Sequence, residues 1–285
     1  MPTRSQKKYD THMNFLSQLE QAILAHNSLL CVGLDTDFEK LPHEVKKHHE
    51  PLLEFNKQII DATAAHVCCY KIQIAYYAAL GTSGIQALMQ TIHYIHANYP
   101  ALPVILDAKR GDIGETSKRY AQEAFDIFEA DAVTVNPYLG KDSLLPFLEK
   151  KDKGVIVLCR TSNEGSSDFQ ELVAEDSPLF LHVAEQATSW HKEFKNCLLV
   201  VGATWPEDMK KIRTVSPEMF FLVPGIGAQG GDLHATLAAG LREDHSGLII
   251  HAARSIIYAS SGQDFAAKAK EEASKLQLSI NEHRK

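Results

Sequence analysis

The chain has 285 residues, 45% of them hydrophobic, enough to bury a sizeable core in one barrel of ~250 residues or in two smaller domains. Ordinary contents of glycine, proline and aromatic residues exclude a disordered or fibrous protein. The net charge of −7 argues against a general nucleic-acid-binding protein, although a local cationic pocket could still bind a small anionic substrate.

Short apolar runs rich in Val, Ile and Leu recur without polar alternation, as is typical of parallel strands covered on both faces. We predict eight strands, over residues 29–34, 67–75, 104–108, 132–136, 155–159, 198–203, 220–223 and 248–252. Segments with helical spacing lie between them, over residues 52–65, 85–97, 116–130, 178–195, 207–215, a short 231–239 and a last 265–278.

This alternation favours an α/β protein with a single (β/α)8 TIM barrel over residues 1–285. A doubly wound open sheet is the alternative. It is disfavoured because eight strands are many for such a sheet and no G-x-G-x-x-G sequence follows the first one.

The expected location is cytoplasmic, without membrane contact. Residues 1–10 are polar and basic and lack the apolar core of a signal peptide, and no apolar stretch approaches the ~18 residues of a membrane helix. The cysteines form no C-x-x-C pair and lie in apolar runs, which favours buried thiols in a reducing compartment over a metal or redox site.

The third strand ends in Asp107 and Lys109, which strand alternation places on one face. At the C-terminal end of a barrel strand, that face looks into the active site. The pair offers a fixed negative charge beside a proton donor. An ion pair that only caps the barrel, or a surface acidic cluster with Asp112 and Glu115, is the alternative. A helix is expected to start at Thr116.

The seventh strand runs into residues 224–232, whose four glycines let backbone N–H groups approach an anion closely. The positive end of the short helix that follows would add to this attraction. Arg254 follows the eighth strand, and arginine is the preferred bidentate partner of phosphate. Barrel phosphate sites lie after strands seven and eight, so the pattern predicts such a site rather than a turn and a surface arginine.

Three further residues lie at strand ends. Asp35 follows the first strand, and Lys71 lies within the second, where a lysine is costly unless it is paired or functional. Ser162 opens the polar segment 161–177, the longest irregular piece, which should act as a lid over the mouth and could donate a hydrogen bond to a substrate.

The fourteen histidines do not predict a metal site. They are scattered or clustered on expected helix faces, H-E-x-x-H is absent, and only His251 lies at a predicted strand end.

These motifs resemble those of a known family. D-A-K-R-G-D-I-G-E-T closely resembles the D-x-K-x-x-D-I-x-x-T signature of orotidine 5′-monophosphate decarboxylases, and P-G-I-G-A-Q-G-G is similar to their phosphate loop. V-G-L-D, A-V-T-V-N-P-Y-L-G, L-C-R-T-S-N, V-V-G-A-T and A-R-S-I-I-Y-A-S follow in the family's order, nearly end to end. N-P-Y-L-G-x-D-S and C-R-T-S-N resemble the longer-chain bacterial subgroup.

The resemblance implies decarboxylation of orotidine 5′-monophosphate to uridine 5′-monophosphate, the last step of de novo pyrimidine synthesis, without cofactor or metal. Asp107 would press its charge against the substrate carboxylate, and Lys109 would protonate carbon 6. Asp112 and Thr116 would serve the neighbouring subunit's site in a homodimer, and Ile113 would bind substrate.

The resemblance also implies how the rest of the nucleotide is held. Asp35 and Lys71 would contact the ribose and complete an alternating charge network with Asp107 and Lys109. Ser162 would bind the pyrimidine edge. The phosphate would be held by Gln229, Arg254 and backbone amides, including that of Gly227.

The sequence departs from the family pattern at two loop positions. Glu164 stands where the subgroup commonly has proline, and Ala253 where many members have glycine before the phosphate arginine. Both concern lid motion and the phosphate cradle rather than the chemistry.

Two other functions stay open. A metal-dependent sugar-phosphate enzyme resembling 3-hexulose-6-phosphate synthase shares a D-x-K-x-x-D on strand three, but Lys71 stands where it would need an acidic ligand. A non-catalytic barrel that binds a phosphate ligand is the other alternative. The intact charged positions argue against it.

Overall fold

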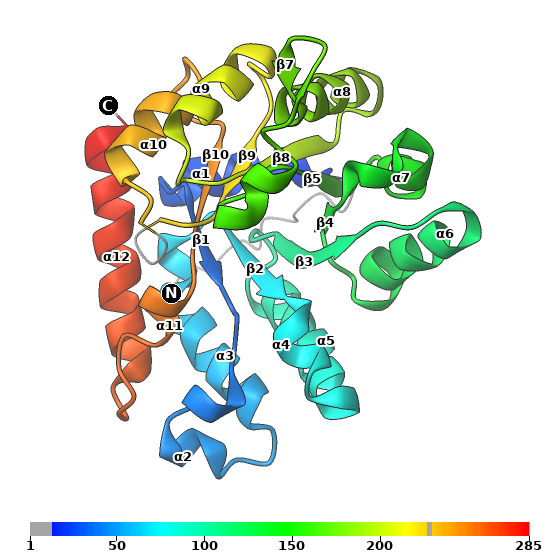
Figure 1. The fold of residues 1–285 in the computed structure, drawn as a ribbon. Helices are drawn as coiled ribbons and strands as arrows, with labels where there is room; N and C mark the ends of the chain where they lie inside the picture. Colours follow the sequence, from blue (N-terminus) through cyan, green and yellow to red (C-terminus); the bar gives the residue numbers. More distant parts are fainter. Residues whose placement is uncertain (1–12, 227–229, 285) are drawn as a thin grey trace, which may run out of the picture.

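Eight parallel strands close into a barrel in the computed structural model, which describes residues 13–226 and 230–284 (Figure 1). The first strand pairs with both the second and the last, which closes the ring. The predicted α/β barrel is thereby confirmed. The barrel strands are β1 (Leu30–Gly33), β2 (Cys69–Gln73), β3 (Val104–Arg110), β4 (Ala132–Val135), β5 (Gly154–Arg160), β8 (Cys197–Val201), β9 (Phe221–Val223) and β10 (Leu248–Ala252).

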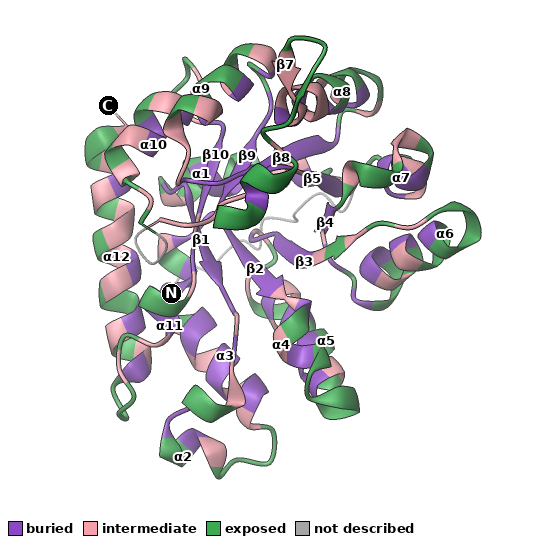
Figure 2. Ribbon diagram, in the orientation of Figure 1, coloured by how far each residue is buried: buried purple, intermediate pink, exposed green. Residues whose placement is uncertain are grey.

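The strands form the core because their apolar runs are covered from both sides, by the barrel interior and by the surrounding helices (Figure 2). Every residue of β1, β4, β8 and β9 is buried. The five cysteines are all buried and unpaired, as the apolar runs around them predicted.

An outer ring of helices surrounds the strands (Figure 1). Its members are α3 (Pro51–Thr63), α5 (Gly81–Asn98), α6 (Gly114–Gln122), α7 (Lys141–Leu148), α8 (Leu179–Phe194), α9 (Pro206–Val215), α10 (Leu233–Gly240) and α12 (Phe265–His283). Shorter helices lie in the connections, namely α2 (His43–Lys46), α4 (Ile74–Ala78) and α11 (Arg254–Ile257). Within residues 13–226 and 230–284, no helix combines the length and the apolar character needed to span a bilayer.

The helix α1 (Phe15–His26) was not among the predicted elements. Phe15, Leu19, Ala22 and Ile23 are its buried residues, a spacing that places them on one helical face. The Phe15 ring lies against Gly154 at the start of β5, where an added Cβ would come within 2.4 Å of it. The helix therefore packs at the N-terminal end of the barrel, opposite the predicted mouth.

Element boundaries differ from the predictions where helices begin early. The second strand ends at Gln73, and Ile74 and Tyr77 bury their side chains from α4 instead. The helix after β3 begins at Gly114 rather than Thr116 and continues into a π-helical turn, Glu123–Ile127.

The segment 161–177 is less irregular than predicted. It contains a 3₁₀ turn, Glu164–Asp168, and a small hairpin of β6 (Val173–Ala174) and β7 (Ser177–Pro178). Glu175 and Asp176 form the hairpin's loop with positive φ values of 48° and 70°, as expected of a two-residue turn whose twist matches its strands.

Candidate active site

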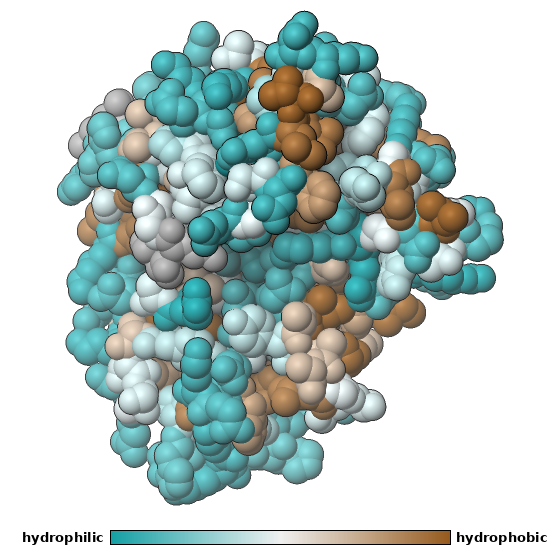
Figure 3. All heavy atoms as spheres, viewed as in Figure 1, coloured by the Kyte–Doolittle hydropathy of each residue, from teal (hydrophilic) through white to brown (hydrophobic). Residues whose placement is uncertain are grey.

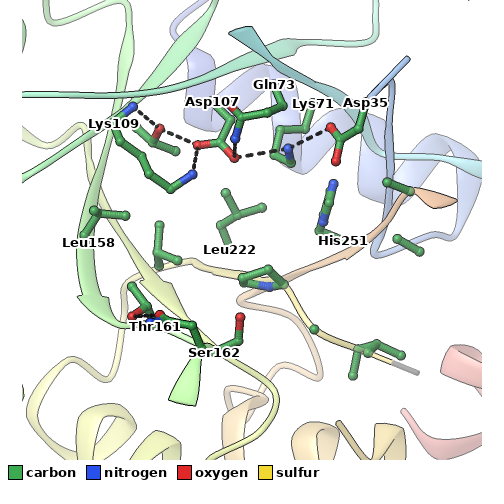
Figure 4. A pocket seen from close by; sticks show the side chains of 18 of the residues that line it. Asp35, Lys71, Gln73, Asp107, Lys109, Leu158, Thr161, Ser162, Leu222 and His251 are labelled. Atoms are coloured by element: carbon green, nitrogen blue, oxygen red, sulfur yellow. Dashed lines mark hydrogen bonds and ion pairs between the residues drawn. The ribbon is translucent and has the colours of Figure 1, made fainter. Parts of the chain in front are cut away.

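A cavity of about 480 Å³ opens at the C-terminal ends of the barrel strands, a size that suits a small-molecule ligand (Figure 4). Strands β2 to β5, β8, β9 and β10 and the segments after β1, β5, β9 and β10 contribute its walls. In the space-filling view the centre of this face is hollowed and largely hydrophilic (Figure 3). The mouth therefore lies where the sequence placed it.

Charges alternate along one wall of the cavity (Figure 4). The Lys71 ammonium lies 3.3 Å from Asp35 Oδ1 and 3.2 Å from Asp107 Oδ2, and the Lys109 ammonium lies 2.7 Å from Asp107 Oδ1. We call these four residues the charge row. Lys71 and Asp107 are buried, with 3% and 8% of their surfaces exposed, whereas 47% of the Lys109 side chain is exposed.

Asp107 accepts hydrogen bonds from four side chains. Besides the two lysines, Gln73 Nε2 donates to Oδ2 at 2.9 Å and Thr134 Oγ1 donates to Oδ1 at 2.8 Å. An ionised carboxylate offers about four acceptor positions, so these donors hold Asp107 in one orientation.

The charge row keeps its buried pair, Lys71 and Asp107, ionised. Burial by itself raises the pKa of Asp107, but Lys71 and Lys109 outweigh it and hold that pKa well below its ordinary value. Burial likewise lowers the pKa of Lys71, but Asp107 and Asp35 together raise it above its ordinary value. Both shifts favour the charged pair.

Lys109 lies beside Asp107, as predicted, but regular strand alternation is not the reason. Regular alternation does not continue to Lys109, because the β3–β4 register shifts between Leu106 and Arg110 and Lys109 has a left-handed φ of 48°. Such a conformation costs a non-glycine residue roughly 1–2 kcal/mol. The two side chains converge because the strand bulges.

His251 from β10 also lines the cavity. Its buried Nε2 has no hydrogen-bond partner among the described residues, and a Cβ at Gly33 would come within 2.3 Å of it. Only glycine therefore leaves room for the ring at position 33. Burial and the nearby Lys71 lower the pKa of His251 to about 3, so the imidazole is neutral near pH 7.

Ser162 lines the cavity from the start of the segment 161–177, which we call the lid. Arg160 is fully buried and anchors the base of this lid. Its guanidinium donates to Asp208 at 3.0 Å and to Ser166 at 2.7 Å, pairs with Glu171, and stacks 4.4 Å from the Trp205 ring. These contacts tie the lid to α9.

Arg254, Ser255, Gly225 and Ile226 also line the cavity, from the segments that follow the neighbouring strands β10 and β9. Gly225 has a φ of 101°, a backbone conformation that favours glycine. Asp232 caps the helix after β9, α10, and accepts a hydrogen bond from the backbone N–H of Ala235 at 2.8 Å, whereas the expected attraction of this helix end for an anion stays a prediction. Gly227 and Gln229, both predicted to bind phosphate, lie outside the described residues.

Comparisons with known proteins match this architecture. The model of the Orotidine 5′-phosphate decarboxylase / HUMPS family matches residues 28–269. The orotidine 5′-phosphate decarboxylase of Cellvibrio japonicus is 52% identical over 94% of this chain and 98% of its own length. The chain belongs to this family.

Solved structures agree. The OMP decarboxylase of Leishmania donovani is 41% identical, with a TM-score of 0.82 over 95% of this chain and 99% of its own. The UMP synthase of the same organism is also 41% identical, with a TM-score of 0.85, and this chain spans 57% of it. The family resemblance on which the sequence analysis relied is confirmed.

Three residues that the family resemblance assigned to a substrate do not line the cavity of their own chain. Asp112, Ile113 and Thr116 lie on the loop after β3 and the first turn of α6. Ile113 is 60% exposed, Thr116 is exposed, and Asp112 Oδ1 accepts a hydrogen bond from the neighbouring Ile113 N–H. We call these three residues the rim loop.

Several polar side chains that line the cavity were not among the predicted site residues, and Gln73 and Thr134 are the two that contact Asp107. Signals for both were present. Gln73 stands two residues after Lys71 on the same strand and so shares its face, and Thr134 is the one polar residue in the apolar strand β4. His251 was noted for its strand-end position but was expected to be an ordinary histidine.

Proposed function

We propose that this chain decarboxylates orotidine 5′-monophosphate to uridine 5′-monophosphate, the last step of pyrimidine synthesis, in the cytoplasm. The alternating charge row within a nucleotide-sized cavity is the observation that carries the proposal. The relative that is 52% identical is named for this substrate. The five free, buried thiols are in keeping with a reducing compartment.

In the proposed reaction, the bond between carbon 6 and the substrate carboxylate breaks and its electron pair stays on carbon 6. Carbon dioxide leaves, and the Lys109 ammonium donates one proton to the carbon. The exposure of Lys109 lets it regain a proton from water. Atoms and charges balance without an oxidant, a reductant or a cofactor.

Electrostatics make Lys109 the proposed donor. An ammonium held beside carbon 6 stabilises negative charge where it develops, and Asp107 fixes its position at 2.7 Å. Asp107 also lies on the wall that the substrate carboxylate would face, and loss of carbon dioxide would relieve that repulsion. Opposite charges ~4 Å apart gain roughly 4 kcal/mol at an effective dielectric of about 20, so one lysine cannot supply the whole acceleration.

Binding of the substrate's phosphate, away from carbon 6, would supply the remaining acceleration. Arg254 and the glycine segment beginning at Gly225 would hold the phosphate, and Ser162 would bind the pyrimidine edge as the lid closes. Binding energy gained at the phosphate would then drive closure and the exclusion of water from carbon 6. Asp35 and Lys71, at the buried end of the row, would contact the ribose.

We further propose a homodimer whose sites are shared. Ile113 and Thr116 of the rim loop are exposed, and two large apolar side chains of the loop after β4 are exposed too, Tyr138 at 82% and Leu139 at 46%. A two-fold contact through these loops would bury them and carry each rim loop to the neighbour's mouth in a reciprocal exchange.

The metal-dependent sugar-phosphate function is less well supported. Lys71 stands between the carboxylates of Asp35 and Asp107, where a cation would otherwise bind. Among the residues that the structure describes, no three His, Cys, Asp or Glu side chains converge on one point.

Decarboxylation of orotidylate, followed by its absorbance with and without excess chelator, tests the proposed function. We expect equal turnover under both conditions. Turnover that disappears with chelator and returns with magnesium would support the sugar-phosphate alternative. Binding of the nucleotide without turnover would support a non-catalytic barrel.

A further inference from the structure

The hydroxyl of Thr134 lies between the two groups that the proposed chemistry uses most. Its Oγ1 accepts a hydrogen bond from the Lys109 backbone N–H at 2.9 Å and donates one to Asp107 Oδ1 at 2.8 Å. Thr134 is 1% exposed and comes from β4, the strand beside the one that carries both partners. One buried atom is therefore shared by the carboxylate and by the backbone of the lysine.

The direction of both hydrogen bonds is fixed by chemistry. An amide N–H can only donate and an ionised carboxylate can only accept, so the single hydroxyl proton must point at Asp107. The hydroxyl lone pairs are left for Lys109.

The bulge in β3 explains why a side chain is needed here. Leu106 pairs with Val133 and Arg110 pairs with Val135, so residues 107–109 of β3 lie opposite Thr134 alone. The Lys109 N–H donates a hydrogen bond to the threonine hydroxyl. The hydroxyl thus supports the backbone where the strand register shifts and Lys109 adopts its left-handed φ of 48°.

We infer that Thr134 is a positioning residue for the Asp107–Lys109 pair. It orients the carboxylate that holds the ammonium and fixes the strained backbone that carries the lysine. This inference rests on the proposed function, in which Lys109 delivers the proton. Thr134 acts through those two residues and needs no contact with the reacting carbon.

Thr134→Val removes the hydroxyl and keeps the branched shape, whereas Thr134→Ser keeps the hydroxyl. With orotidylate as substrate we expect the valine variant to lose about 100-fold in kcat, as small displacements of reacting groups do, with KM changed by less than about threefold. The serine variant should stay within about threefold of wild type in kcat. Thr188→Val, on the outer helix α8, makes the same chemical change away from the cavity and should leave kcat unchanged.

A second measurement does not depend on turnover. Hydrogen exchange of the Lys109 backbone amide should accelerate about tenfold or more in Thr134→Val and remain near the wild-type rate in Thr134→Ser, because the loss of one protecting bond lets the bulge open locally. Thr134→Ala serves if the valine variant does not fold. If wild type fails to decarboxylate orotidylate, the proposed function fails while the exchange result still tests the positioning role.

Two results would overturn the inference. Valine and serine variants equally impaired in kcat would show that side-chain volume matters and the hydroxyl does not. A folded valine variant with wild-type kcat and wild-type exchange at Lys109 would show that the bulge holds its geometry without Thr134.

Discussion

Two members of the charge row, Asp107 and Lys109, belong to the same signature sequence as the rim loop, yet the two regions differ in burial and in hydrogen bonding. Asp107 is buried and accepts four side-chain hydrogen bonds, whereas the cavity lining of its own chain does not include Asp112, five residues later. Ile113 next to it exposes 60% of its surface. One chain therefore completes the charge row by itself, whereas the residues of the rim loop do not reach the cavity of their own chain.

The two regions also differ in how they would contribute to catalysis. The charge row is rigid before any ligand arrives, because its bonds are already made, and such preorganisation costs nothing at the moment of reaction. The rim loop and the lid would gain their contacts only on assembly or closure. Substitutions should therefore separate the two kinds of contribution.

The largest effect is expected from Lys109→Ala. Because it removes a transition-state contact from a half-exposed side chain, kcat for orotidylate should fall by several orders of magnitude while the melting temperature changes little. Steady-state kinetics and thermal unfolding check both parts. Lys268→Ala, an exposed lysine of α12 with a carboxylate partner, is the matched control and should retain full activity. Retention of more than about a tenth of the wild-type rate in Lys109→Ala would remove Lys109 from the proposed role.

Arg254→Ala should have the next largest effect, on the phosphate end of the cavity. We expect kcat/KM to fall by the equivalent of about 2–5 kcal/mol, the range for truncating one partner of a buried charge pair. Arg254→Lys keeps the charge but not the bidentate fork, so its loss should be intermediate. Free phosphite should partly restore turnover of a substrate that lacks its phosphate. Unchanged kinetics in Arg254→Ala would place the phosphate elsewhere.

The smallest effect is expected from His251, which lies beside the charge row, and it concerns how the free energy of unfolding depends on pH. Its folded pKa of about 3 lies below the ordinary 6.5, so the folded state binds fewer protons than the unfolded chain between these values. The stability that follows is fully present above pH 6.5 and is lost as pH falls towards 3. His251→Asn cannot ionise and should lose this component, worth up to about 1.4 kcal/mol per pH unit. Denaturant unfolding at pH 7, 5 and 4 measures it, and parallel pH profiles for the two proteins would contradict it.

Asp107 affects the free energy of unfolding at lower pH than His251 does. Its pKa is lowered from 3.8, so its contribution to stability is present above that value and is lost as pH falls below it. The difference between wild type and His251→Asn above pH 4 therefore isolates the histidine.

The sequence was sufficient to predict the barrel because its strands are continuous apolar runs and its helices alternate with them. It also predicted which strand ends carry Asp35, Lys71, Asp107 and Lys109. It could not predict the bulge at Lys109, because residues 104–110 contain no glycine or proline to mark one, and the register shift depends on the pairing with β4. The role of Thr134 was missed for the same reason, since it follows from that pairing.

Sequence patterns also gave too little weight to His251. The His251 ring has room beside β1 because residue 33 is a glycine, and this contact joins distant segments of the chain. The cap of α10 depends on how the Asp232 side chain folds back on its own helix. The roles assigned to Gly227 and Gln229 stay predictions.

We propose that the charge row acts in the active site of its own barrel and that the rim loop completes the active site of a neighbouring subunit. Lys109→Ala and Asp112→Ala proteins, each severely impaired alone, are mixed under conditions in which subunit exchange is verified by mass. Random assortment makes half of the dimers mixed, each with one site that carries both defects and one that carries none, so activity should rise towards roughly a quarter of the wild-type value. Lys109→Ala mixed with Lys71→Ala is the control and should stay inactive, because both residues lie in one chain's charge row. If the first mixture stays as inactive as the control despite exchange, Asp112 does not complete a neighbour's site and the division is wrong.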